Sequence, residues 1–284
     1  MNVDKTTTKH RSESARIRED RPDDSRPSSK RKHEYDESID DPRRRHPFDT
    51  NALDHCETPR AAYEHLRDFL DVLGRSMMVA STYGMSLWDP YYCDGGSKRI
   101  LRDIGFDNVI HENADFYDVI KKEESIPPHD VLVTNPPYSE DHIYRLLEFV
   151  VGTEIANQRP VCLLLPNWVS RRPDYETRFA IPVARGKCEL FYLSPLTPYT
   201  YIMPPFVHRE DRPEHVGSSG ETTPYLSSWY IVVPSSLCRG NSFLEMMDAV
   251  ARKRKPKAWV VARTVRGLKW KMKKVRQHVN ANGA

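Results

Sequence analysis

The sequence predicts an α/β sandwich with a mostly parallel sheet and an antiparallel edge hairpin. Short apolar runs alternate with segments of helical periodicity between residues 58 and 166. That alternation is typical of parallel strands joined by crossover helices. Two later apolar runs, 189–195 and 227–234, are separated by a long loop and predict a pair of antiparallel strands.

Each predicted element rests on a local pattern. Residues 58–74 place Leu66, Phe69 and Leu73 at helical spacing, and "GSKRILRDIG" at 96–105 indicates a shorter helix. Ser139 is a candidate N-cap for a third helix that ends near residue 150. Strands are predicted in the apolar stretches 85–90, 130–134 and 160–166, and a further short strand is predicted within 107–118.

Composition divides the chain into three parts. The 284 residues are 38% hydrophobic and 29% charged, which indicates a globular core diluted by polar flanks. Residues 1–48 are charged, Ser/Pro-rich and poor in apolar side chains, so we expect a disordered tail. Residues 49–248 form the main domain. Residues 249–284 are expected to form a basic amphipathic arm.

The basic arm gathers the positive charge of the chain. After Asp248 there are 12 Lys and Arg residues and no acidic one, although the whole chain has a net charge of only +3. Val261, Val265, Leu268 and Met272 recur at steps of four and three, which predicts an apolar stripe on a basic helix. This distribution favours a polyanionic partner, and the alternative is a solvated tail.

Several classes of protein are not expected. No apolar run is long enough to cross a membrane, and no apolar signal core begins the sequence. The five cysteines lack metal-ligand spacing, so we expect no metal site and a reduced, intracellular protein. Basic clusters at residues 30–32 and 43–45 leave both nucleus and cytoplasm open. The oligomeric state is not predicted.

The segment Asn135-Pro136-Pro137-Tyr138 carries the clearest chemical signal. It follows a buried strand, where ligands of open α/β sheets bind. The Asn135 side-chain carbonyl and the Pro136 backbone carbonyl are two acceptors on a stiff backbone, and Tyr138 adds a ring for stacking. This arrangement fits a planar exocyclic amine. Holding its hydrogens out of plane releases the nitrogen lone pair for attack. The alternative is a rigid turn with Tyr138 in the core.

These residues resemble motif IV of the class I, S-adenosylmethionine-dependent amino-methyltransferases, in their Asn-Pro-Pro-Tyr type specific for adenine N6. The likeness extends from about residue 55 to 235 and includes "CETPRAAYEHL", "WDPYYCDGG" and "NVIHENADFYD". It implies a Rossmann-like methyltransferase sandwich with S-adenosylmethionine as cofactor. One departure is clear, because Cys93 or Asp94 stands where the family loop usually has glycine.

The resemblance also implies a set of cofactor-binding residues. These are Thr58 and Pro59 for the carboxylate end, Asp89, Pro90 and Gly95 for the methionine part, Glu112 for the ribose, and Asp115 with Phe116 for the adenine. Each has a structural alternative: Asp89-Pro90 as a turn, Asp115 as a helix N-cap, and Glu112 as a solvated side chain.

Three amines fit such a site: adenine N6, a protein glutamine amide, and cytosine N4. The basic arm favours nucleic acid, and adenine must then be single-stranded or flipped, which costs about a few kcal/mol. Predicted substrate contacts are Tyr199 and Tyr201, as the aromatic residues most exposed among prolines, and Arg252, Lys253, Arg254 and Lys255. We therefore expect transfer to adenine N6 in RNA or in single-stranded or flipped DNA. The alternatives are a protein glutamine N5-methyltransferase and a non-catalytic nucleic-acid-binding protein with the same fold.

Overall fold

The structure is a computed structural model, and its described residues belong to one compact unit, Glu37–Ala284. They are residues 46–48, 54, 56–79, 84–203, 221–222, 225–238, 240–254 and 256–282. The tail predicted for residues 1–48 lies outside the described residues apart from 46–48, and so does Lys255.

Seven strands within the described ranges form one mixed sheet, in the order β2-β1-β3-β4-β8-β5-β9. Strands β2, β1, β3 and β4 are parallel, as predicted, whereas β8 is antiparallel to both of its neighbours and β9 is antiparallel to β5. The strands are β1 Leu87–Trp88, β2 Val109–Ile110, β3 Val131–Thr134, β4 Val161–Pro166, β5 Cys188–Pro195, β8 Ser227–Pro234 and β9 Trp259–Ala262. A separate ribbon pairs β6, Tyr201–Ile202, with β7, Glu221–Thr222.

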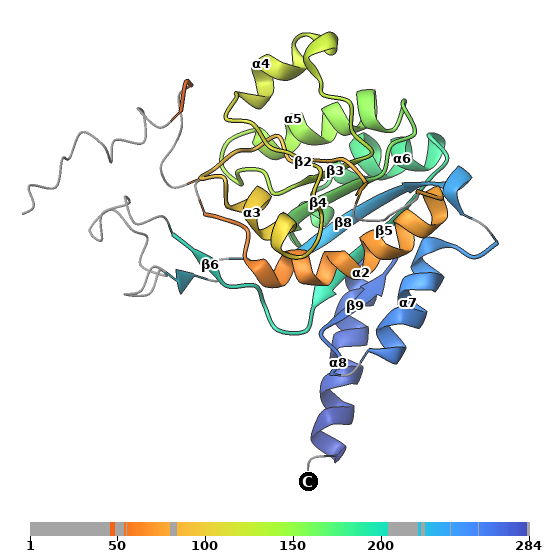
Figure 1. The fold of residues 1–284 in the computed structure, drawn as a ribbon. Helices are drawn as coiled ribbons and strands as arrows, with labels where there is room; N and C mark the ends of the chain where they lie inside the picture. Colours follow the sequence, from red (N-terminus) through yellow and green to blue (C-terminus); the bar gives the residue numbers. More distant parts are fainter. Residues whose placement is uncertain are drawn as a thin grey trace, which may run out of the picture. The chain divides into compact units, whose positions relative to one another are not determined.

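Helices cover both faces of the sheet, so that its strands are apolar on both sides. On β8, Trp229 and Ile231 pack into one core and Tyr230 and Val232 into the other. The first core is closed by α2 (Arg60–Met77), α3 (Gly96–Asp103) and α7 (Phe243–Lys253). The second is closed by α4 (Phe116–Ile120), α5 (His142–Phe149), α6 (Ile181–Arg185) and α8 (Val265–Asn282). Figure 1 shows α2 and α7 on the opposite side of the sheet from α5 and α6.

The order of the strands creates a switch point beside β1. The chain passes from β1 through α3 to β2 on one side, and then through α4 to β3 on the other side of β1. The carboxyl ends of β1 and β3 therefore lie side by side with connections leaving in opposite directions. Ligands of open α/β sheets bind in the crevice at such a point. Asp89 directly follows β1, and Asn135 directly follows β3.

The predicted antiparallel pair is present, but it does not form the edge of the sheet. Strands β5 and β8 pair as expected, from Cys188 opposite Pro234 to Leu193 opposite Trp229. Strand β8, however, lies between β4 and β5, and the edge is β9. The sequence analysis missed β9 because the apolar residues of Trp259–Ala262 also fit the helical spacing of the segment that follows.

The apolar stripe of the C-terminal arm packs on the body of the protein, but the arm is not the single helix that was predicted. Its predicted boundary at residue 249 falls inside α7, and Val261 lies on β9, fully buried, rather than on a helix. The helix begins only at Val265, where Thr264 Oγ1 accepts a hydrogen bond from Gly267 N at 3.0 Å. The arm is therefore part of the sheet and its covering layer. None of the helices in the described part of the chain has the length and apolar character needed to span a membrane.

Candidate active site

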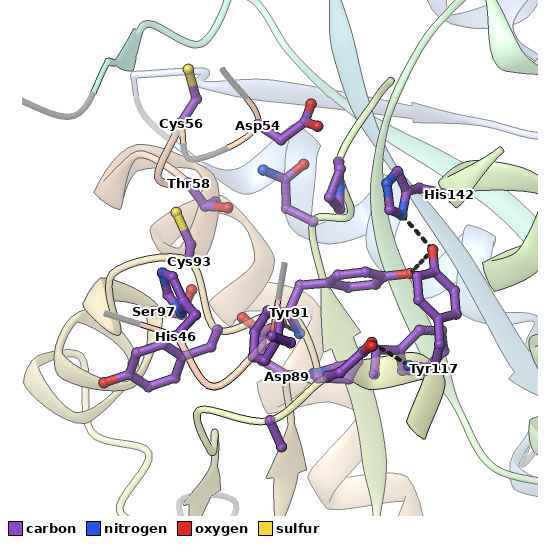
Figure 2. A pocket seen from close by; sticks show the side chains of 18 of the residues that line it. His46, Asp54, Cys56, Thr58, Asp89, Tyr91, Cys93, Ser97, Tyr117 and His142 are labelled. Carbon is purple, nitrogen blue, oxygen red and sulfur yellow. Dashed lines mark hydrogen bonds between the residues drawn. The ribbon is translucent and has the colours of Figure 1, made fainter. Parts of the chain in front are cut away.

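A cavity of about 440 Å³ lies at the switch point and is lined by both Asp89 and Asn135. Its walls come from the segment before α2, the loop between β1 and α3, the start of α4, and the residues after β3. Figure 2 shows Cys56, Thr58 and Ser97 on one side, Tyr117 with His142 on the other, and Asp89 below and between them. The volume is in the range of small-molecule sites.

A buried hydrogen bond ties the ends of β1 and β3 together. Thr134 Oγ1 donates to Asp89 Oδ1 at 2.6 Å, and Asp89 is only 3% exposed. On the other side, His111 Nδ1 donates to the Asp89 backbone carbonyl at 2.9 Å. Burial raises the pKa of Asp89, while the nearby His111 and the bond from Thr134 oppose that rise. The two strands thus fix a carboxyl group at the floor of the cavity.

The Asn-Pro-Pro-Tyr segment presents Asn135 and Pro137 to the cavity. Pro136 is buried and, like Tyr138, is not part of the lining. The half-buried Tyr138 instead donates its hydroxyl to Asn135 Oδ1 at 2.7 Å and to Leu164 O at 3.2 Å. Tyr138 therefore holds the Asn135 side chain rather than offering a ring to the cavity. Since an amide oxygen has two lone pairs, Asn135 keeps one acceptor site for a ligand.

This contact gives a first prediction. Tyr138→Phe removes the hydroxyl that holds Asn135, so we expect the amide to sample more orientations and the methyl transfer proposed below to slow. We expect kcat to fall by about tenfold, the worth of one hydrogen bond of roughly 1.4 kcal/mol, with unchanged cofactor affinity. Steady-state kinetics and calorimetry measure both quantities. Tyr144→Phe is the matched control, because the Tyr144 hydroxyl only contacts Asp174 at 3.5 Å. Equal rates for the two variants would contradict the positioning role.

The loop after β1 departs from the family pattern without closing the cavity. Cys93 lies in the left-handed region with φ 51° and lines the cavity, whereas the predicted Gly95, with φ 80°, does not. Gly96 N donates to Glu57 Oε1 at 2.8 Å at the start of α3. A Cβ on Gly96 would come within 2.3 Å of that carboxylate, so a larger residue there would displace the Glu57 side chain. Glu57 thereby brings a second carboxylate to the cavity wall.

The cavity is predominantly acidic. Its carboxylic residues are Asp54, Glu57, Asp89, Asp115 and Glu140. The basic residues of the lining are one arginine, Arg145, and two histidines. Ser139 does not cap α5 as predicted, because it donates to Asp54 Oδ2 at 2.6 Å, and α5 begins after Asp141. Burial raises the pKa of Asp54, and the bond from Ser139 opposes the rise. Such a lining favours a ligand with positive charge.

One wall of the cavity is aromatic, and the sequence analysis missed most of it. The Tyr91 ring lies 4.9 Å from Phe116, and its hydroxyl is 3.4 Å from that of Tyr117, which in turn hydrogen bonds to His142 (Figure 2). The Arg145 guanidinium covers the Tyr117 ring at 3.3 Å. His142 and Arg145 are three residues apart on α5, and that helical spacing was the available signal.

The structure brings together seven of the predicted catalytic and cofactor residues. The cavity is lined by Thr58, Asp89, Pro90, Asp115, Phe116, Asn135 and Pro137. Pro59 does not belong to the lining. Asp115 is also a helix N-cap, as its alternative predicted, because Oδ1 accepts from Tyr117 N at 2.8 Å. Glu112 is exposed and pairs with Lys98 at 3.6 Å instead of facing the cavity, which is its predicted alternative.

The two predicted aromatic substrate contacts are buried, whereas two of the predicted basic contacts, Arg252 and Lys253, are exposed. Tyr199 and Tyr201 are only 2% and 3% exposed, so neither ring forms an open platform for a base. Arg252 pairs with Asp248 at 2.6 Å, and Arg254 pairs with Asp68. Lys253 is exposed at the end of α7. The prolines around the tyrosines suggested a loop, but the ribbon β6–β7 buries Tyr201 on the body of the protein.

No group of three or more His, Cys, Asp or Glu side chains suited to hold a metal occurs in the part of the chain that the structure describes. A scan against models of protein families finds no match for this chain, and neither does a search among curated proteins. The case for a function therefore depends on the site itself.

Proposed function

We propose that this protein transfers a methyl group from S-adenosylmethionine to an exocyclic amine, most specifically adenine N6 in a nucleic acid. The proposal includes a Rossmann-like methyltransferase fold. The observation that carries it is the shared cavity of Asp89 and Asn135, which follow adjacent parallel strands at the switch point. The predicted cofactor floor and the predicted amine acceptor thus belong to one site.

The residues of the cavity fit the proposed cofactor. S-adenosylmethionine supplies an electrophilic sulfonium methyl group, and it also carries an ammonium group and an adenine ring. Asp89 and Glu57 are carboxylates suited to the cationic groups, and the buried Thr58 adds a hydroxyl. Tyr91 and Phe116 offer apolar faces to a flat ring. The cavity volume of about 440 Å³ suits a ligand of this size.

Asn135 has the chemistry to hold the reacting amine. Its side-chain oxygen accepts one N–H of the target with the lone pair that Tyr138 leaves unused. The predicted second acceptor, the carbonyl of Pro136, does not line the cavity. The bond to Asn135, on a stiff backbone, holds one amine hydrogen away from the nitrogen lone pair, which then points at the methyl group. The proton leaves after the nitrogen has become cationic, so no residue has to act as a base beforehand.

Adenine is preferred over glutamine because exposed positive charge lies on the same edge of the sheet, as described below. A glutamine amide places the same demands on Asn135, so a protein substrate remains the competing interpretation of the site. A non-catalytic protein with this fold is the other alternative. The observation that favours the non-catalytic alternative is Cys93, which puts a side chain at a cavity position where the family loop usually has glycine.

The test uses S-adenosylmethionine labelled in its methyl group, incubated with the purified protein and separate pools of RNA, DNA and protein. We expect label in a nucleic acid pool, recovered as N6-methyladenosine or its deoxy form by mass spectrometry of nucleosides. Label in protein alone would overturn the substrate class and favour glutamine. Absence of both label and calorimetric cofactor binding would favour the non-catalytic alternative.

A further inference from the structure

A second groove, of about 430 Å³, opens on the same edge of the sheet as the candidate active site. It forms where β4 and β5 end and β8 begins, and one face of α8 closes it. Because β8 is antiparallel to both β4 and β5, those two strands point in the same direction as β1 and β3. The groove therefore opens at the carboxyl edge of the sheet, as does the cavity of Asp89 and Asn135.

Three cationic side chains of α8 line this groove: Lys269, Lys273 and Arg276. They are exposed and lie at steps of four and three, on one helical face. Leu268, 1% exposed, and Met272, packed against the second core, hold α8 to the body beside them. The basic face is therefore fixed in place on a docked helix.

Within the described residues, no carboxylate compensates the positive charge of this face. None of the acidic residues that the structure describes lines the groove or forms an ion pair with Lys269, Lys273 or Arg276. By contrast, Lys271, on another face of the same helix, pairs with Asp248 at 2.5 Å. Asn167, Ser194, Ser227 and Gln277 add neutral polar groups to the lining, and its other residues are apolar. Arg276 also donates to Leu196 O at 3.3 Å. Three cations that form no ion pair with a described residue, beside neutral polar groups, fit a chain of phosphates.

An exposed aromatic residue connects the groove to the Asn-Pro-Pro-Tyr segment. Tyr225 is 42% exposed and contacts the Tyr138 ring edge to face at 5.8 Å. Its neighbour Leu226 lines the groove, and Leu226 O accepts a hydrogen bond from Asn167 N at 2.8 Å. The strands β4, β8 and β5 follow β3 in order, so their ends lie roughly 5 to 15 Å from that of β3. Tyr225 thus stands between the amine acceptor and the basic face.

We propose that the carboxyl edge is a track for single-stranded nucleic acid, with phosphates on Lys269, Lys273 and Arg276 and a base stacked on Tyr225. A basic groove with adjacent aromatic rings is how sequence-tolerant single-strand binding arises. The target base then enters the cavity at Asn135 without disrupting a duplex. The identity of that base rests on the proposed function, but binding along the track does not require methyl transfer.

The test measures binding of the full chain to fluorescent single-stranded RNA and DNA about 20 nucleotides long, which exceeds the site size of one binding module. Lys269→Gln/Lys273→Gln/Arg276→Gln removes three phosphate contacts. We expect the slope of log K against log salt to fall by about 2 and affinity at about 0.1 M salt to fall by on the order of 100-fold. The matched control is Lys122→Gln/Arg185→Gln/Lys187→Gln, three exposed basic residues in segments that precede β3 and β5. This control is expected to keep both the slope and the affinity.

The outcomes separate the track from the proposed function. Equal losses in the two triple variants, tighter binding of a matched duplex, or no binding of either single strand by the wild-type protein would overturn the track. A groove variant that methylates oligonucleotides at the wild-type rate would overturn it too, and would leave the proposed function standing. A groove-specific loss of binding without methyl transfer by the wild-type protein would retain the track and remove the enzyme. Tyr225→Ala, which keeps the charge, is expected to weaken binding by roughly 5- to 150-fold with an unchanged salt slope.

Discussion

Asn135→Ala is expected to lower methyl transfer by on the order of 100- to 1000-fold while cofactor affinity stays at the wild-type value. The side-chain oxygen of Asn135 is the proposed acceptor for the reacting amine, and alanine removes it. Loss of one fixed hydrogen-bonding group at a reacting centre has this order of effect. Single-turnover rates with labelled cofactor measure the transfer, and calorimetry measures the affinity.

The matched control for this variant is Asn157→Ala. Asn157 is an exposed asparagine that donates to Thr153 O at 2.9 Å, and it does not line the cavity. We expect wild-type transfer from the control. Transfer by Asn135→Ala within threefold of wild type would exclude the acceptor role. Equal loss of cofactor binding and transfer in Asn135→Ala would show instead that the substitution disrupts the cavity.

Asp89→Asn is expected to weaken cofactor binding by about 10- to 100-fold, because it removes the most buried carboxylate of the cavity and keeps its shape. This range corresponds to one charge-assisted hydrogen bond of about 1.5 to 3 kcal/mol. The amide of the variant still offers an oxygen to the Thr134 hydroxyl, so the junction of β1 and β3 is retained. Asp94→Asn is the control, since Asp94 is an exposed carboxylate on the same loop and is not part of the cavity lining. Equal affinities of the two variants would contradict the assignment.

The free energy of unfolding of Asp89→Asn shows whether weaker cofactor binding comes from the lost carboxylate or from a destabilised fold. Burial raises the pKa of Asp89, so the folded protein binds that proton more tightly than the unfolded chain does. The stabilisation from this group is present at low pH and is lost as the pH rises through the raised pKa. The side chain of asparagine does not ionise, so the variant loses no stability from this position as the pH rises. We therefore expect the free energy of unfolding of the variant, relative to wild type, to increase from about pH 4 to about pH 7 in urea titrations. A relative decrease would show that the ionised carboxylate stabilises the fold.

Local patterns in the sequence were sufficient to predict the parallel half of the fold. The stretch from Val131 to Thr134 is apolar on both faces because helices cover both sides of the sheet, so it appears as a continuous run. The residue that leaves such a strand lies at its carboxyl end, and for that reason Asn135 and Asp89 were predictable as partners in one site.

Features that depend on long-range contacts were not predictable. The run Trp259–Ala262 has the length of a strand, yet only its pairing with β5 distinguishes it from the start of a helix. Tyr201 is buried because its strand pairs with Thr222, a partner 21 residues away in the sequence. The role of Tyr138 was equally hidden, since its hydroxyl reaches both Asn135 and the backbone of β4. Helix and strand propensities and hydrophobic periodicity describe neighbouring residues only, so they do not predict contacts between residues far apart in the sequence.

A crystal structure with S-adenosylhomocysteine and a short adenine-containing oligonucleotide tests the central claim most directly. We predict the sulfur in the cavity between Asp89 and Asn135, with the exocyclic nitrogen of the adenine within hydrogen-bonding distance of Asn135 Oδ1. A cofactor product bound elsewhere, or a base amine that approaches the sulfur without contact to Asn135, would contradict the claim.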